Sequence, residues 1–127
     1  GAEGSYNELF RRGVDAAYGA AADDVYRAYC DLFRACPLAV RTANRVFVSH
    51  SLTPARFLDR FDPARLEEDE FPDADLSPGG LVYGLVWGRD ADDDTAEEFL
   101  RRADADLLVT GHLPAEEGFL VPNDRRV

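Results

Sequence analysis

The hydrophobic pattern of this chain changes its period at Pro37, and this change constrains the fold more than any other feature of the sequence. Before Pro37, apolar residues recur at the three- and four-residue spacing of amphipathic helices. After it, short apolar runs typical of strands alternate with helix-like segments. Because such alternation favours helices layered on a sheet over a helical bundle, we expect an α/β sandwich. Residues 1–127 are expected to form one domain or part of one.

Two helices are predicted before Pro37. Ser5 and Glu8 match a capping box, in which a hydroxyl and a carboxylate three residues later bond the free N–H groups at a helix start. Apolar residues then follow at helical spacing until Gly19. A second helix is predicted for residues 23–35, because the proline at position 37 cannot continue it.

The remaining segments are predicted from short apolar runs and cap signals. The expected strands are residues 38–41 and 45–49, which form a hairpin, and residues 81–87, 107–110 and 118–121. Thr53 and Pro54 are expected to open a short helix, and Thr95 with Glu98 to form a second capping box. Residues 62–75 are acidic and predict a surface loop with up to one helical turn, its charges facing either solvent or a basic substrate.

The net charge of −11 limits the partners of this chain. An acidic surface repels phosphate backbones, so we expect no binding to nucleic acid. No apolar run reaches membrane-spanning length and no signal peptide is evident, so a cytoplasmic protein without a membrane partner is expected. Cys30 and Cys36 would point to different faces of a helix and are expected to be free thiols. The absence of Lys, Ile and Met indicates a high-GC bacterial gene. Because the first residue is Gly and not Met, we expect this sequence to begin inside its gene.

Each of the two histidines follows an apolar strand-like run. His50 comes directly after residues 46–49, and His112 comes two residues after residues 107–110. Because strand ends on a rigid sheet commonly carry the sites of α/β proteins, the pair is a candidate set of metal ligands. Each histidine also has a structural interpretation, as a buried polar residue with a satisfied hydrogen bond, and the pattern alone leaves both open.

Arg89 is a candidate phosphate-binding residue. It follows the apolar run 81–87, and its planar guanidinium can offer two parallel N–H donors to a phosphate. The alternative is an ion pair with one of the nearby carboxylates, Asp90, Asp92 or Asp93. Both interpretations stay open at the level of sequence.

Nucleophilic catalysis by serine is poorly supported. Ser49 and Ser51 flank His50, but neighbouring side chains of an extended strand point to opposite faces, so the imidazole of His50 is not expected to activate either hydroxyl. The turn at residues 78–80 lacks the lysine and the helix start of a phosphate-binding loop.

Three motifs, together with the stretch that precedes them, resemble the phosphoprotein phosphatase family of calcineurin-like metallophosphoesterases. Residues 46–54 resemble its strand ending in a metal-binding His, followed by Leu and Pro. Residues 85–90 are similar to its Trp-x-Arg motif, in the form of bacterial and phage members, where the Arg contacts phosphate. Residues 99–119 resemble the helix and strand that lead to Gly-His and then Glu-Gly-aromatic. Residues 26–40 resemble the Phe-x-x-Cys-Pro-x-Ala stretch before the hairpin, so the agreement covers roughly residues 24–122.

The resemblance implies a fold and an activity. The fold would be the C-terminal half of a four-layer αββα sandwich, with mixed sheets and flanking helices. The activity would be metal-dependent hydrolysis of phosphomonoesters on phosphoproteins, in which two divalent ions (Mn, Fe or Zn) activate a bridging water. His50 and His112 would bind one of these ions, and Arg89 would bind the substrate phosphate.

The chain departs from the family in its missing front half. The motifs Gly-Asp-x-His-Gly, Gly-Asp-x-x-Asp-Arg-Gly and Gly-Asn-His-Glu, which supply the other metal ligands, are absent. We therefore expect a fragment of a longer parent, inactive or nearly so alone, that can associate through an exposed sheet face. The alternatives are a diadenosine polyphosphate hydrolase of the same superfamily, and a non-catalytic interaction domain without metal affinity.

Overall fold

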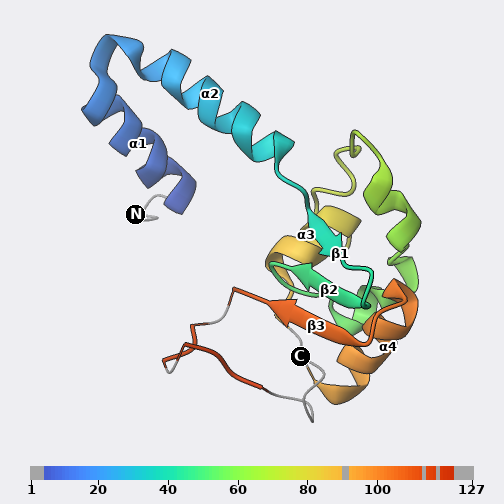
Figure 1. Cartoon of the computed structure of the whole chain (residues 1–127). Coiled ribbons are helices and arrows are strands. Elements are labelled where there is room, and N and C mark those ends of the chain that lie inside the picture. Colours follow the sequence, from blue (N-terminus) through green and yellow to red (C-terminus); the bar gives the residue numbers. More distant parts are fainter. Residues whose placement is uncertain (1–4, 90–91, 113, 117, 122–127) are drawn as a thin grey trace. The chain divides into compact units, whose positions relative to one another are not determined.

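The computed structural model describes residues 5–89, 92–112, 114–116 and 118–121 (Figure 1). The chain divides at Pro37 into two compact units, residues 1–37 and residues 38–127. The N-terminal unit is therefore the part with helical period, and the C-terminal unit is the part with alternating strands and helices. No described helix is long and apolar enough to cross a lipid bilayer.

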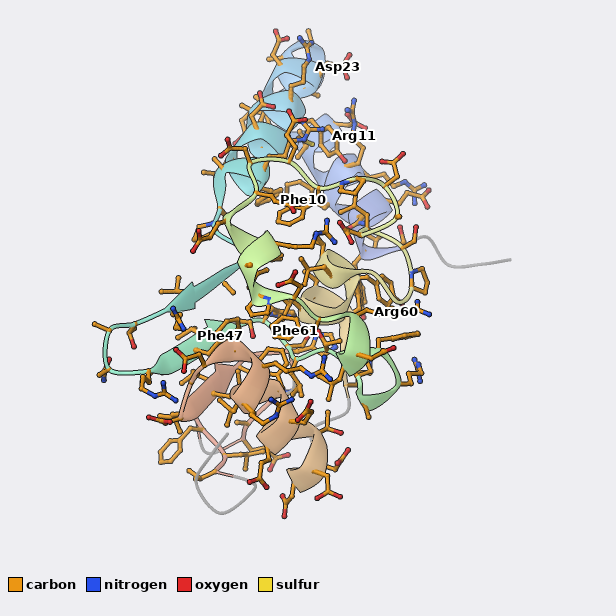
Figure 2. All side chains as sticks on the ribbon, turned by 90° about the vertical axis from the view of Figure 1, so that its right-hand side faces the viewer. Phe10, Arg11, Asp23, Phe47, Arg60 and Phe61 are labelled. Carbon is orange, nitrogen blue, oxygen red and sulfur yellow. The ribbon has the colours of Figure 1, made fainter. Side chains whose placement is uncertain are left out.

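The N-terminal unit is a pair of helices, α1 (Tyr6–Tyr18) and α2 (Ala22–Ala35), joined by a 3₁₀ turn at Gly19–Ala21. Both predicted helices are confirmed, and the Ser5 hydroxyl accepts the Glu8 N–H, which is one of the two bonds of the predicted capping box. Aromatic contacts such as that between Phe10 and Tyr29, with ring centroids 5.3 Å apart, join the two helices. Figure 2 labels Phe10 and the ion pair of Arg11 with Asp23. Both cysteines are free.

The C-terminal unit contains a mixed three-stranded sheet of order β1-β2-β3. The hairpin is confirmed, because β1 (Ala39–Arg41) and β2 (Val46–Ser49) pair antiparallel. The run before His112 is also confirmed as a strand, β3 (Leu107–Thr110), which pairs parallel with β2. β2 is therefore the central strand, and the C-terminal ends of β2 and β3 lie at the same edge of the sheet (Figure 1).

Two of the predicted strands are wrong. Residues Leu81–Trp87 form a helix, α3, whose buried residues are Leu81, Gly84 and Leu85, and its C-cap Gly88 is buried as well. A short apolar run is compatible with a buried strand or a buried helix, and packing against the other elements selects the helix here. Residues 118–121 form no strand, and Phe119 is 74% exposed. Over the described residues the fold is thus a mixed α/β unit with one sheet, and the four-layer sandwich is not seen.

The remaining helical elements begin close to their predicted positions, with different caps. The 3₁₀ helix η2 (Ala55–Arg60) has Pro54 as its N-cap. The prediction places Thr53 at the N-cap and Pro54 at the first helical position. A second 3₁₀ helix, η3 (Pro63–Glu67), is the helical turn predicted in the acidic loop. Helix α4 (Asp93–Ala103) starts at the Asp92 cap, whose carboxylate accepts both the N–H and the hydroxyl of Thr95. The capping box predicted at Thr95 is therefore wrong.

The core of the C-terminal unit lies on one face of the sheet. Phe99 of α4 is fully buried, stacks on Phe61 with centroids 4.5 Å apart and meets Phe47 of β2 edge-on at 5.3 Å. Leu85 of α3 and Leu108 of β3 belong to the same buried cluster. Figure 2 shows Phe47 and Phe61 pointing into this layer. Helices α3 and α4 thus both cover the inner face of the sheet.

The outer face of the sheet is apolar and exposed. The β1-β2-β3 register places Val40 beside Val48 and Val48 beside Val109, and these side chains are between 38% and 47% exposed. Leu107 lies on the same face and is 36% exposed. A sheet with one face in solvent normally carries polar residues there, so this face has the composition of a surface that another layer covers.

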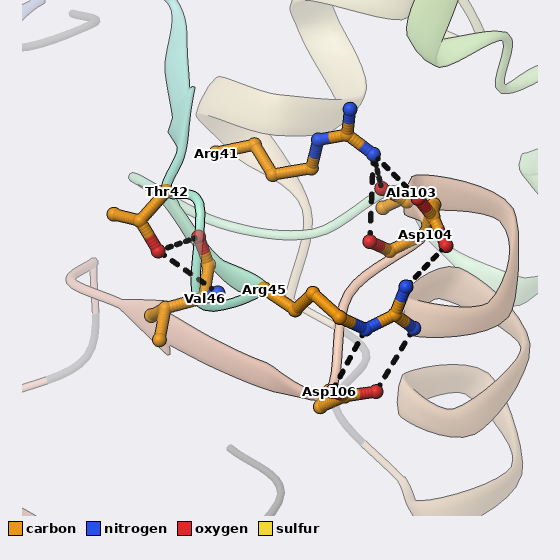
Figure 3. Close-up of polar contacts among 7 residues, drawn as sticks. All are labelled: Arg41, Thr42, Arg45, Val46, Ala103, Asp104 and Asp106. Carbon is orange, nitrogen blue, oxygen red and sulfur yellow. Dashed lines mark hydrogen bonds and ion pairs between the residues drawn. The ribbon is translucent and has the colours of Figure 1, made fainter.

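Four charged residues tie the hairpin to the turn between α4 and β3 (Figure 3). Arg45 donates to both oxygens of Asp106 at 2.8 and 2.9 Å and to Asp104 at 2.5 Å, and Arg41 donates to Asp104 at 2.9 Å. The hydrogen bond from Arg45 lowers the pKa of Asp106. This network fixes the sheet edge opposite to the one that carries the histidines.

Asp75 provides a test of pH-dependent stability. Its buried carboxylate accepts two hydrogen bonds from Arg65, at 2.6 and 3.1 Å, and these hydrogen bonds lower the pKa of Asp75. A carboxyl whose pKa is lower in the folded state stabilises the fold above its unfolded pKa, and this contribution is lost as the pH falls through the folded pKa.

We therefore expect Asp75→Asn to lower the free energy of unfolding at pH 7 by about 2 kcal/mol, because a charge-assisted bond is lost. Urea unfolding at pH 7 and pH 3 measures the difference between variant and wild type, which should shrink at pH 3. The exposed Asp73, on the same loop, supplies the control Asp73→Asn, which should change little. A variant difference that is equal at both pH values would refute the role of the Asp75 charge.

Candidate metal centre

The parallel pairing of β2 and β3 brings the two histidines together. His50 follows β2 directly, and His112 lies two residues beyond β3. The Gly111 N–H donates to the His50 carbonyl at 3.1 Å, which continues the pairing past the last strand residues. As a result His50 Nε2 lies 2.9 Å from His112 Nδ1, and the two rings are nearly perpendicular at 86°.

This distance fits two chemical arrangements. In a metal-free protein it is a hydrogen bond, with one imidazole as donor and the other as acceptor. Two nitrogens that each lie about 2.1 Å from one ion and subtend a right angle at it are about 3 Å apart. The separation expected for two ligands of one ion is therefore present, while metal binding itself stays a prediction.

The surroundings of His112 favour a neutral imidazole. Burial is the main cause that lowers the pKa of His112, and the positive charge of Arg89 and the neighbouring His50 add to it. His112 Nε2 is buried and has no hydrogen-bond partner among the described residues. The backbone of His112 has a φ of 65°, in the left-handed region that few non-glycine residues adopt. The neutral imidazole is the form of histidine that binds metal ions.

Arg89 lies at the same edge of the sheet. It lines a small cavity of about 20 Å³ together with His112, Gly111 and Ser51. Arg89 is exposed. The Asp92 carboxylate accepts from Thr95, and among the described residues no ion pair joins Arg89 to Asp92 or Asp93. Asp90, the third carboxylate considered for it, lies outside the described residues. Among the residues that the structure describes, the guanidinium is thus available to an anion beside the histidine pair.

Other potential ligands do not gather at this site. The described part of the chain contains no group of three or more His, Cys, Asp or Glu residues that could hold a metal ion. Structural and catalytic metal sites use three or four protein ligands, so two imidazoles make half of such a site. A larger cavity of about 480 Å³ lies elsewhere in the C-terminal unit, and none of the residues that line it lines the cavity beside His112.

Two residues beside the histidines were not predicted as parts of the site. The indole of Trp87 lies edge-on to the His112 ring, with centroids 6.3 Å apart. The hydroxyl of Ser51 is buried and donates to the Gly84 carbonyl of α3 at 3.1 Å, so Ser51 is not placed as a nucleophile, as the sequence predicts. Placing 81–87 in a strand hid both contacts, because only the helix brings Gly84 and Trp87 to this edge. The buried positions 81, 84, 85 and 88 have helical spacing, but the sequence carries no signal of it, because residues 81–87 contain almost no polar residue.

Comparison with known proteins gives a distant similarity. The chain is 26% identical, over an alignment 143 positions long, to a protein of Encephalitozoon cuniculi named probable serine/threonine-protein phosphatase. The alignment covers 98% of this chain and 29% of that relative, so the chain spans less than a third of the relative's length. No family model matches the chain, and no solved structure matches it.

Proposed function

We propose that this chain provides two ligands of a dinuclear metal site in a serine/threonine phosphoprotein phosphatase. The observation that carries the proposal is the 2.9 Å separation of His50 Nε2 and His112 Nδ1 at the ends of two parallel strands. The similarity to a protein named probable serine/threonine-protein phosphatase supports the same class of reaction. That relative is eukaryotic, so the bacterial origin expected from composition stays a prediction.

The residues of this chain fit the first coordination shell of such a site in part. His50 Nε2 and His112 Nδ1 would hold one ion, and neutral imidazoles suit Mn, Fe or Zn better than Mg or Ca. When bound, the metal ions would lower the pKa of water and stabilise charge on the phosphoryl oxygens. Arg89 would orient the phosphate with two parallel N–H bonds. The other ligands would come from residues outside this chain.

The outer face of the sheet supports the larger architecture. Its row of Val40, Val48 and Val109 needs a second layer, and the relative contains more than twice as much chain outside the aligned part as inside it. We infer that a second sheet of a longer protein covers this face and completes a four-layer αββα sandwich. The 127-residue chain alone should then associate through this face, and analytical ultracentrifugation that found only monomer at high concentration would contradict the inference.

Metal titration tests the proposal directly. Trp87 is the only tryptophan, and its ring lies 6.3 Å from His112, so Co²⁺ at the histidine pair should quench its emission. We expect saturable quenching in the wild-type chain and none in His50→Ala. A double Cys30→Ser, Cys36→Ser variant controls for binding to the thiols and should behave as wild type. Quenching that survives in His50→Ala would place the metal elsewhere.

Arg89→Ala tests the phosphate-binding role. In a longer protein that contains this chain, we expect phosphatase turnover on a phosphoserine peptide to fall about a hundredfold, because an oriented charge on the transition state is lost. Metal content, measured by atomic emission, should stay at the wild-type level. The exposed Arg34 of α2 supplies the control Arg34→Ala, which should keep full activity. Unchanged turnover in Arg89→Ala would remove Arg89 from the site, and loss of metal would give it a structural role.

A further inference from the structure

The segment that follows His50 is bonded to the C-terminal half of α3. The Ser51 N–H donates to the Leu85 carbonyl at 2.8 Å, and the Ser51 hydroxyl donates to the Gly84 carbonyl at 3.1 Å. The Leu85 carbonyl belongs to the last turn of α3, whose carbonyls have no N–H partner within the helix. The Ser51 N–H therefore supplies a hydrogen bond that the helix end lacks. The Ser51 hydroxyl adds a second bond at the Gly84 carbonyl, which also accepts the Gly88 N–H, and Ser51 as a whole is only 3% exposed.

Close backbone approach surrounds these bonds. A Cβ atom added to Gly88 would lie 1.8 Å from the Leu52 carbonyl oxygen, and one added to Gly84 would lie 2.9 Å from Thr53 Oγ1. The Ser51 carbonyl in turn accepts the Ser49 hydroxyl at 2.7 Å. Ser51 is thus hydrogen-bonded both to Ser49 and to α3. The backbone of residues 51–53 lies in direct contact with the glycines at positions 84 and 88.

The end of α3 carries the two other groups of the site. Trp87 is the last residue of α3 and lies edge-on to His112, and Arg89 follows two residues later. Ser51, Arg89 and His112 line the same cavity of about 20 Å³. We propose that Ser51 is a positioning residue, which sets the place of Trp87 and Arg89 relative to the two histidines through its bonds to α3. The inference rests on the proposed function only where it assigns phosphate to Arg89. The positions of Trp87 and Arg89 beside the histidines do not require a metal.

The placement can be measured in the metal-free chain by NMR. We expect Ser51→Ala to fold, to shift the His112 ring proton resonances toward their values in Trp87→Phe, and to lose at least half of the intensity of the Trp87–His112 cross-relaxation peaks. Ser51→Thr keeps the hydroxyl and should restore the wild-type spectrum. Ser77→Ala is the matched control, because the Ser77 hydroxyl also donates to a backbone carbonyl, that of Asp73 at 3.1 Å, but is exposed.

A binding experiment separates positioning from general stability. In the Co²⁺-loaded chain, Ser51→Ala should leave the Co²⁺ affinity within twofold and weaken inorganic phosphate binding about tenfold, because a displaced guanidinium loses its oriented contact. A wild-type chain that binds neither Co²⁺ nor phosphate would defeat the proposed function, while the NMR measurement would still decide the placement.

The positioning role fails if the Trp87–His112 peaks and shifts are identical in Ser51→Ala and wild type. If Ser51→Ala does not fold, hydrogen exchange in the wild-type chain decides. A Ser51 amide as protected as the amides of β2 supports the role, and one that exchanges at the rate of an open chain overturns it.

Discussion

Gly88→Ala is expected to destabilise the C-terminal unit severely. The new Cβ atom would lie 1.8 Å from the Leu52 carbonyl oxygen and 2.6 Å from that of Gly84, so two backbone segments would have to separate. Both neighbouring atoms belong to the backbone and not to the flexible end of a side chain. The overlap therefore cannot be removed by a small side-chain movement. We expect a loss of about 4 kcal/mol or more in the free energy of unfolding, the size reserved for severe backbone or core defects.

Urea unfolding followed by Trp87 emission and far-ultraviolet circular dichroism measures this loss. The control is Gly13→Ala in α1, where an added Cβ would meet nothing within 4 Å. That substitution should stabilise its helix by about 0.5 to 1 kcal/mol, since alanine has the higher helix propensity. A Gly88→Ala chain that unfolds within 1 kcal/mol of wild type would show that α3 does not lie against Leu52 as described.

His112→Asn is expected to abolish metal binding with little change in fold. Asparagine tolerates the left-handed backbone that His112 adopts, with its φ of 65°, better than alanine does. The variant therefore removes Nδ1 without adding backbone strain. We expect the Co²⁺ affinity to fall by more than about a hundredfold, because loss of a residue that merely supports a ligand already costs about 10- to 100-fold.

Isothermal titration with Co²⁺, with thermal unfolding as the check on folding, measures the effect. The comparison with His112→Gly separates the loss of the ligand atom from any effect of the new side chain. Glycine also accepts the backbone conformation but offers no side-chain donor. Both variants should lose the metal equally. If His112→Asn binds Co²⁺ with wild-type affinity, the 2.9 Å pair is a structural hydrogen bond and the metal proposal is wrong.

Much of the fold could be predicted because local signals agree with the final packing. Pro37 and Gly19 end their helices as expected, and the hairpin between β1 and β2 follows from the polar turn between two apolar runs. The meeting of His50 and His112 was predictable for a similar reason. Both follow apolar strands, and parallel neighbours bring equivalent ends to the same edge of a sheet.

The errors lie where local signals are ambiguous. Residues 81–87 contain almost no polar residue, so neither the two-residue nor the helical period is visible in them, and tertiary packing decides the conformation. Asp92 competes successfully with Thr95 for the cap of α4, because both residue types are good caps only three positions apart. The Ser51 contacts with α3 depend on that helix and could not be anticipated from a predicted strand.

The parallel pairing of β2 with β3 also has a kinetic consequence. Its two histidines are 62 residues apart along the chain, and the intervening segment must close a long loop before they can meet. Closing such a loop costs entropy that only later contacts repay, so non-local pairings of this kind form slowly. Neither strand in isolation presents the pair. The metal affinity that appears during refolding would therefore report when β3 pairs with β2. It should appear later than helices α1 and α2 form.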